Sequence, residues 1–305
     1  MATATLAVIG GSGFYQMEGI TEVEEVNIAT PFGRPSDAIV VGSLEGTRVA
    51  FLPRHGRGHR LSPSEVNYRA NIFALKTLGV ERIISISACG SMREGIRPLD
   101  VVVPDQLFDR TCLRPRTFFG SGLVVHVGFA NPFCPEFSEF LLSSARKSAA
   151  EVEHRPTVHS GGTYICIEGP QFSTRAESRV YRQWGVDLIG MTAIPEAKLA
   201  REAEICYAAL AFDTDYDVWH VSEETVSVEM VVRNLTTNVT MAKGIIRSVA
   251  RRLAAGEAAA RRCECESALA TSIITQSDSI PEPVKRDLAP LVGRYLPVRS
   301  HWDGD

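Results

Sequence analysis

Short apolar runs rich in β-branched residues alternate along the chain with longer stretches whose apolar residues recur at helical spacing. Each run is short, as buried strands usually are, and several end directly in Gly, Ser, Thr or Asp. This alternation predicts an α/β fold built in layers. The runs expected as strands are 6–9, 38–41, 49–52, 82–87, 101–103, 163–167, 188–190 and 205–212.

Three stretches carry the signals of helices. The clearest start lies at Ser62, which can cap a helix while Glu65 reaches back to it, and Gly79 is expected to end that helix. A second helix is predicted after Thr192. A third is predicted over about 223–254, in one or two pieces.

The chain reads as one main domain. Its 305 residues are 45% hydrophobic and 22% charged, which is typical of a globular protein and excludes collagen-like, coiled-coil and largely disordered chains. No repeat and no linker rich in Pro, Gly or Ser divides it. We therefore expect one domain over 1–265 and an extension over 266–305 that packs on this domain or on a neighbouring subunit.

Charge indicates a small-molecule partner. The formal net charge is −4, and no run of like charges suits a nucleic acid or an anionic membrane. The first residues have neither the basic start of a signal peptide nor the length of a membrane span. We expect a cytoplasmic protein that binds neither nucleic acid nor membrane.

Cysteine usage does not suggest a disulfide-stabilised fold. The seven cysteines are odd in number and scattered. Only Cys263 and Cys265 form a pattern, and their one-residue gap does not match the usual zinc or redox spacings. A surface pair is favoured over a metal or redox site, although both remain open. No metal and no organic cofactor is expected.

Two loops at strand ends are candidates for binding an anion. The glycine-rich turn at 10–13 can offer backbone N–H groups and the Ser12 hydroxyl, although a simple tight turn explains it as well. The basic loop at 54–60 holds three arginines and two histidines, whose donors suit phosphate oxygens. A solvated surface loop is the alternative.

Further polar residues follow other predicted strands. Ser87 and Thr192 each stand where a strand runs into small residues, and such ends converge at the carboxyl edge of a sheet. Asp213, Asp215 and Asp217 follow the last predicted strand without the spacing of a calcium loop. A carboxyl group can donate to a purine ring nitrogen or accept from its exocyclic amine. A polar turn is the alternative.

Seven segments, taken together and in order, resemble the methylthioadenosine phosphorylases of the trimeric purine nucleoside phosphorylase family. The likeness spans about 5–250 and implies a single-domain, three-layer αβα fold with a mixed central sheet. The segments are 10–13 (GGSG), 54–59 (RHGRGH), 67–71 (NYRAN), 88–91 (ACGS), 168–172 (EGPQF), 190–196 (GMTAIPE) and 214–217 (TDYD).

The resemblance implies roles for individual residues. Asp215 and Asp217 match the base-recognition pair, with Asp215 as the acid, and an aspartate there implies a 6-aminopurine. His126 would come from an adjoining subunit and, with Val228, face the 5′ group. The residues matching the phosphate site are Ser12, Arg54, His55, Ser87, Ala88 and Thr192, and those near purine and ribose are Phe172, Met191 and Cys89.

The implied activity is phosphorolysis of S-methyl-5′-thioadenosine in purine and methionine salvage, with phosphate as co-substrate and a homotrimer or dimer of trimers as the assembly. Three alternatives stay open: a broader purine nucleoside phosphorylase, a nucleosidase that uses water, and a nucleoside-binding protein without turnover.

Overall fold

The computed structural model describes residues 3–11, 17–220, 228–258 and 260–297. Eleven strands of these residues form one mixed sheet with the order β2-β3-β4-β1-β5-β10-β9-β7, while β11 pairs with β5 and β6, and β6 with β8. The strands are β1 (Leu6–Gly10), β2 (Thr21–Val26), β3 (Ile39–Leu44), β4 (Thr47–Pro53), β5 (Arg82–Ser91), β6 (Val101–Val103), β7 (Gln106–Arg110), β8 (Val158–Ser160), β9 (Thr163–Ile167), β10 (Leu188–Gly190) and β11 (Cys206–Asp215).

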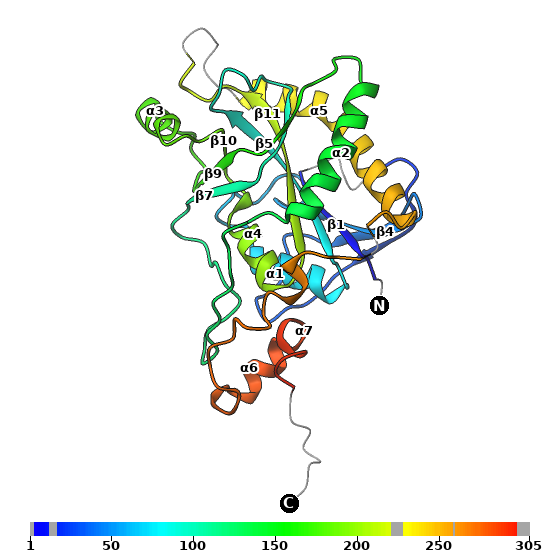
Figure 1. Cartoon of the computed structure of the whole chain (residues 1–305), viewed down its shortest axis with the longest axis vertical. Helices are drawn as coiled ribbons and strands as arrows, with labels where there is room; N and C mark the ends of the chain where they lie inside the picture. The colour runs from blue at the N-terminus through cyan, green and yellow to red at the C-terminus, as the bar shows by residue number, and fades with distance from the viewer. Residues whose placement is uncertain (1–2, 12–16, 221–227, 259, 298–305) are drawn as a thin grey trace, which may run out of the picture.

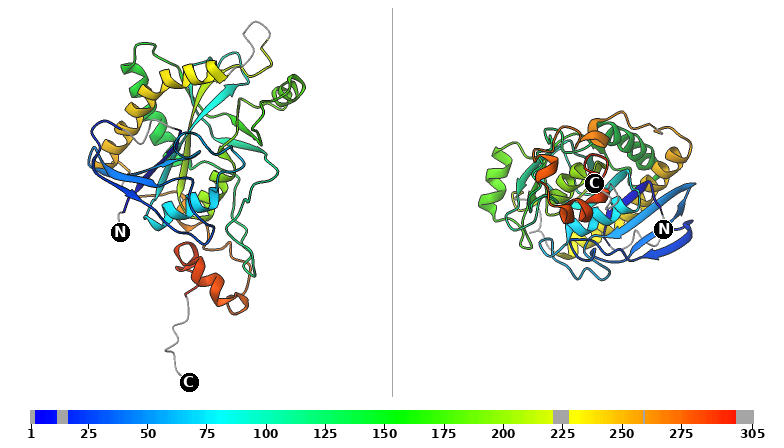
Figure 2. Two further views of the ribbon diagram at one scale, coloured as in Figure 1. Left: turned by 180° about the vertical axis from the view of Figure 1, so that it is seen from behind. Right: turned by 90° about the horizontal axis from the view of Figure 1, so that it is seen from below.

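Helices cover both faces of this sheet (Figures 1 and 2). One apolar cluster joins the sheet to α1 (Tyr68–Thr77) and α4 (Ala193–Glu202). A second joins the opposite face to α2 (Pro135–Glu151) and α5 (Val228–Ala254). The predicted α/β fold with a mixed central sheet is therefore confirmed.

Strand β5 is the centre of the sheet and places the candidate site. It pairs along most of its length with β11 in parallel. Its first half pairs with β1 in parallel, and its last residues pair with β10 in antiparallel fashion. The expectation that strands end at one carboxyl edge holds for β1, β4 and β11, but β10 arrives from the opposite direction and meets β5 beyond Ser87.

The first predicted helix begins later than expected. Glu65 accepts hydrogen bonds from the backbone and hydroxyl of Ser62, but these close an isolated turn. The helix is capped by Asn67, whose side chain accepts from the Ala70 backbone, so α1 starts at Tyr68. The third predicted helix is a single one, and the first part of its predicted range, 223–227, lies outside the described residues.

Several elements were not predicted from the pattern. Strand β2 is exposed along most of its length and β7 alternates between exposed and half-buried positions, so neither shows an apolar run. Helix α2 buries Phe137, Leu141 and Ala145 at helical spacing, so its apolar stripe is present in the sequence and was missed. Helix α3 (Arg175–Gln183) buries only Ser178 and Tyr181, which leaves little apolar signal.

The chain beyond 265 packs against the α1 face of the sheet. Leu269, Ile280 and Leu291 are buried in the cluster that contains α1. The elements of this segment are the 3₁₀ turns η1 (Glu264–Ser267) and η2 (Ser277–Ser279) and the short helices α6 (Glu282–Asp287) and α7 (Ala289–Val292). Of the two helices, α7 lies next to α1 and α6 lies beyond α7 (Figure 1). Among the described residues, no helix is long and apolar enough to cross a membrane.

Candidate active site

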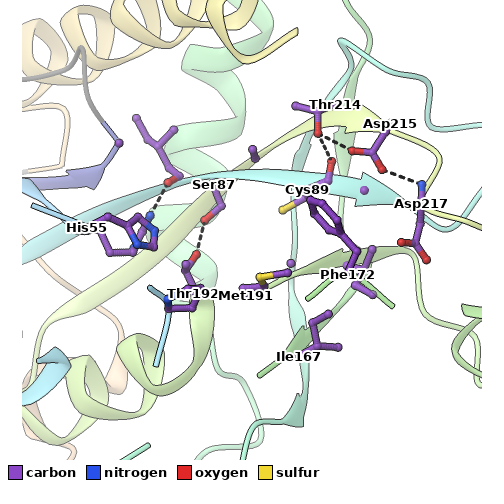
Figure 3. A pocket seen from close by; sticks show the side chains of 18 of the residues that line it. His55, Ser87, Cys89, Ile167, Phe172, Met191, Thr192, Thr214, Asp215 and Asp217 are labelled. Carbon is purple, nitrogen blue, oxygen red and sulfur yellow. Dashed lines mark hydrogen bonds between the residues drawn. The ribbon is translucent and has the colours of Figure 1, made fainter. Parts of the chain in front are cut away.

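A cavity of about 250 Å³ opens where β5, β10 and β11 meet (Figure 3). Most of the residues predicted for the site line this cavity, although they come from positions far apart in the chain. These lining residues are Arg54, His55, Ser87, Ala88, Cys89, Phe172, Met191, Thr192, Asp215 and Asp217.

Two hydroxyl groups meet at one end of the cavity. Ser87 Oγ lies 3.1 Å from Thr192 Oγ1. Thr192 precedes α4 without using its hydroxyl to cap the helix, so this group faces the cavity instead (Figure 3). The pair and the helix start can donate hydrogen bonds to an anion.

Next to this end of the cavity, Arg54 forms a buried ion pair with Glu196. Its Nε donates to Glu196 Oε1 at 2.5 Å and its Nη2 to Glu196 Oε2 at 3.1 Å, and the two side chains are 3% and 0% exposed. Other donors of the guanidinium reach the Ile86 carbonyl and the Ser85 hydroxyl. Although burial opposes the charge, the Glu196 carboxylate raises the pKa of Arg54 above its ordinary value, so the cation is permanent.

His55 is neutral at this end. Burial, together with the charge of Arg54, lowers its pKa to about 4. Its Nδ1 lies 2.9 Å from the Leu61 carbonyl oxygen, and its ring stacks on His59 with centroids 4.4 Å apart. A neutral ring that donates from Nδ1 to a carbonyl keeps Nε2 as an acceptor.

Asp215 marks the opposite end of the cavity. Thr214 Oγ1 donates to its Oδ2 at 2.8 Å, and the Asp217 backbone N–H donates to its Oδ1 at 2.8 Å. A Cβ at Gly90 would lie 2.9 Å from Oδ1, so a glycine there leaves room for the carboxyl group. Burial raises the pKa of Asp215 above its ordinary value, and the Asp217 charge adds to this, against the two hydrogen bonds.

One carboxyl oxygen of Asp217 has no hydrogen-bond partner among the described residues. Its backbone takes a left-handed conformation with φ of 51°, and burial raises the pKa of its carboxyl group. Among the described residues, Oδ2 is buried without a hydrogen-bond partner. Such an acceptor suits an amine of a bound molecule.

The wall between the two ends is mostly apolar. Phe172, Met191 and Ile167 surround the opening in Figure 3, and Phe172 is 47% exposed. Ala88 and Cys89 follow Ser87 along β5 on the inner side. Burial holds the pKa of the Cys89 thiol well above its usual range, so this group is an unreactive part of the wall.

Three predicted residues are not part of the described lining of this cavity. Ser12 lies outside the described residues, as does the side chain of Val228, the first residue of α5. His126 is exposed, and its backbone N–H donates to the Ser272 carbonyl. The described lining of the cavity in one chain does not include His126, which was predicted for a neighbouring subunit.

Other residues of the site were missed or were given no role. Glu196 was included only as the last residue of the segment 190–196, and nothing in the spacing links it to Arg54. Arg114, from a loop, donates to the carbonyl oxygens of Met191 and Glu168 at 2.6 Å each and fixes the cavity wall. Asp213 does not line the cavity, whereas Asp215 and Asp217 do.

Comparisons with known proteins show the family to which this chain belongs. A family model described as "Phosphorylase superfamily" matches residues 5–251. A curated S-methyl-5′-thioadenosine phosphorylase of Geobacter sulfurreducens is 55% identical over 95% of this chain and 99% of its own, and one of Gloeobacter violaceus is 53% identical over 97% of each. A crystal structure of a methylthioadenosine phosphorylase from an antarctic soil metagenomic library has a TM-score of 0.89 and 49% identity, covering 95% of this chain and 99% of that one.

Proposed function

Because the chain belongs to the phosphorylase superfamily, we propose that it is a pentosyltransferase that cleaves S-methyl-5′-thioadenosine with phosphate. The products are adenine and 5-methylthioribose 1-phosphate. The observation that carries this proposal is that one cavity holds an anion-binding end at Ser87, Thr192 and His55 and an acidic end at Asp215 and Asp217.

Phosphate would bind at the end with the hydroxyl groups. Ser87 and Thr192 can donate to its oxygens, and the buried Arg54 cation supplies a favourable field. Neutral His55 can accept the hydrogen of hydrogen phosphate at Nε2. Holding the nucleophilic oxygen against C1′ in this way can contribute ~7–11 kcal/mol at the favourable limit.

The leaving base would bind at the acidic end. Asp217 Oδ2 can accept from the 6-amino group of adenine, because this buried oxygen is otherwise without a partner among the described residues. Asp215 can give a proton to N7 when it is protonated, and its raised pKa favours that form. In the reaction a phosphate oxygen forms the new bond to C1′, N9 leaves with the electron pair of the broken bond, and the proton from Asp215 neutralises the purine.

The chemistry needs no organic cofactor in this scheme, because phosphate is the second substrate. Positive charge that develops on the ribose faces bound phosphate, and negative charge that develops on the purine faces an acid. The apolar wall formed by Phe172, Met191 and Ile167 suits an uncharged ribose and a methylthio group.

We propose further that the chain works in the cytoplasm, in purine and methionine salvage, as a homotrimer or a dimer of trimers. His126 of a neighbouring copy would then close the site near the 5′ group, which explains why it is absent from the described lining in one chain. Sedimentation velocity of the purified protein would give the mass of the assembly, and a monomer would contradict this part of the proposal.

Adenine release from S-methyl-5′-thioadenosine with and without phosphate tests the function. We expect release only with phosphate, in equal amounts with 5-methylthioribose 1-phosphate. Release without phosphate would indicate a nucleosidase, and binding without release would indicate a nucleoside-binding protein. Equal or faster cleavage of adenosine, inosine or methylthioinosine would indicate the broader phosphorylase.

A further inference from the structure

Four cysteines gather at a place remote from the candidate active site. The Sγ atoms of Cys134, Cys206, Cys263 and Cys265 all lie within 4.8 Å of one another. Three of these residues are buried and Cys263 is half-buried. Cys134 precedes α2, Cys206 begins β11, and the other two lie in and before η1, so the cluster joins three separate segments of the chain.

We propose that this cluster is a structural metal site in which four cysteine thiolates hold one zinc ion. Zinc in such sites is tetrahedral with bonds of ~2.3 Å, which places neighbouring sulfur atoms ~3.8 Å apart. The Sγ atoms of Cys206 and Cys263 are 3.3 Å apart, and no two of the four are more than 4.8 Å apart, so this value lies within the observed range.

The surroundings favour thiolates. Cys134 caps α2, and its Sγ accepts a hydrogen bond from the Phe137 backbone N–H at 3.5 Å, which places it at the positive end of a helix. Four thiolates around a divalent ion keep two negative charges. Arg82, Arg252 and Arg261 line the cavity next to Cys134 and Cys206, but each is paired with a glutamate, so the excess charge is offset mainly by the helix end and not by these cations.

Disulfides fit the arrangement less well than a metal does. All seven cysteines are free thiols, and the 3.3 Å between Cys206 and Cys263 is well beyond a bond of ~2.05 Å. The four sulfurs form one mutually close group rather than two separate pairs. One ion at its centre would satisfy all four at once and release their protons.

This proposal departs from the expectation drawn from the sequence. The one-residue gap between Cys263 and Cys265 looked unlike a zinc pattern, and a surface pair was favoured. The structure corrects that view, because Cys265 is buried and the other two sulfurs come from 57 or more positions away, as the separation of Cys206 and Cys263 shows. The cluster shares no residue with the described lining of the active-site cavity, so its role would be to tie the C-terminal segment to α2 and β11.

Metal analysis of the purified full chain tests the proposal. After reduction, chelation and addition of Zn²⁺, we expect one zinc per chain to survive gel filtration. Co²⁺ in place of Zn²⁺ is expected to give the intense visible absorption of tetrahedral cobalt bound to thiolates. Cys206→Ser and Cys263→Ser should each lose the retained ion, whereas the matched control Cys112→Ser, at an exposed cysteine outside the cluster, should keep it.

The wild-type chain keeps the test decisive if the serine variants fail to fold. A reduced wild-type chain that retains no zinc would overturn the proposal. So would an intact mass without reductant that shows the four cysteines joined in two disulfides, or iron held in place of zinc. Zinc retained by the wild type and by Cys112→Ser, but lost from Cys206→Ser and Cys263→Ser, would support it, and this outcome does not depend on the proposed function.

Discussion

The two ends of the active-site cavity differ in whether their buried ionisable groups belong to an ion pair. At the phosphate end, Arg54 carries a permanent charge that is matched by Glu196 and by hydrogen bonds. At the purine end, Asp215 and Asp217 are buried acids without a cationic partner in any ion pair of the described residues, and burial raises both pKa values.

This difference suggests a division of labour. A paired charge keeps its state at every relevant pH and can orient an anion without moving a proton. An unpaired buried acid changes its state easily, which is what proton transfer requires. The comparison therefore predicts that substitutions at the purine end change rate and pH dependence, while those at the phosphate end change stability and phosphate affinity.

The largest effect is expected from Asp215→Asn, which keeps the shape but removes the acid. We expect kcat for S-methyl-5′-thioadenosine to fall ~10²–10⁴-fold, the usual contribution of general acid catalysis. Steady-state kinetics at saturating phosphate measures this change.

Asp213→Asn is the matched control on the same strand. Burial raises the pKa of Asp213 well above its ordinary value, and Asp213 does not line the cavity, so the substitution changes a buried acid that has no part in the proposed mechanism. Its kcat should stay close to that of the wild type. Near-normal turnover of Asp215→Asn would remove Asp215 from the mechanism.

Glu196→Gln should remove the buried ion pair at the phosphate end of the cavity. It leaves the Arg54 cation buried without its counter-charge, and such losses cost ~3–5 kcal/mol of unfolding free energy. Because phosphate would supply the missing negative charge, saturating phosphate should raise the Tm of this variant more than that of the wild type. Thermal denaturation with and without phosphate measures both effects.

Glu202→Gln, on the same helix α4, is the matched control for Glu196→Gln. Glu202 is buried with a pKa raised to about 7 by burial, and it forms no ion pair among the described residues. Its substitution should cost much less stability, and phosphate should raise its Tm as in the wild type. An equal phosphate effect in Glu196→Gln and wild type would show that Arg54 does not act on phosphate.

The pH dependence of kcat tests whether the charge of Asp217 influences the proton donor Asp215. The raised pKa of Asp215 means that the proton-donating form is present below that pKa and is lost as the pH rises through it. Asp217→Asn removes the like charge that helps to raise this pKa, so the alkaline limb should move to lower pH. An alkaline limb that stays in place would show that the two acids titrate independently.

Individual residues of the site could be predicted from the sequence, but contacts between residues distant in the chain could not. Ser87, Thr192 and Asp215 were visible because apolar runs stop near them, although β5 continues past Ser87 to Ser91. The ion pair of Arg54 with Glu196 joins positions 142 apart, and the cysteine cluster joins three segments. Such contacts depend on how the sheet is wound, which local spacing does not encode.

Competition between two neighbouring helix caps explains why the predicted start of α1 was wrong. Ser62 and Glu65 make the hydrogen bonds of a helix cap, yet the chain starts the helix where Asn67 caps it. Two caps within six residues are both compatible with the local sequence. The choice is made by packing, since Val66 and Tyr68 are buried in the core.

The smallest effect is expected from Thr214→Val, which tests how Asp215 is positioned. The Thr214 hydroxyl donates to Asp215 Oδ2 and lies 3.2 Å from the Cys89 carbonyl oxygen, so it can accept from protonated Asp215 while donating to that carbonyl. Losing one such hydrogen bond costs ~0.5–1.5 kcal/mol, which corresponds to a severalfold to tenfold decrease in kcat. Because this bond lowers the pKa of Asp215, the alkaline limb should also shift to higher pH. Thr214→Ser keeps the hydroxyl and should restore both the rate and the limb, whereas a rate loss without a shift would mean that Thr214 only supports the local packing.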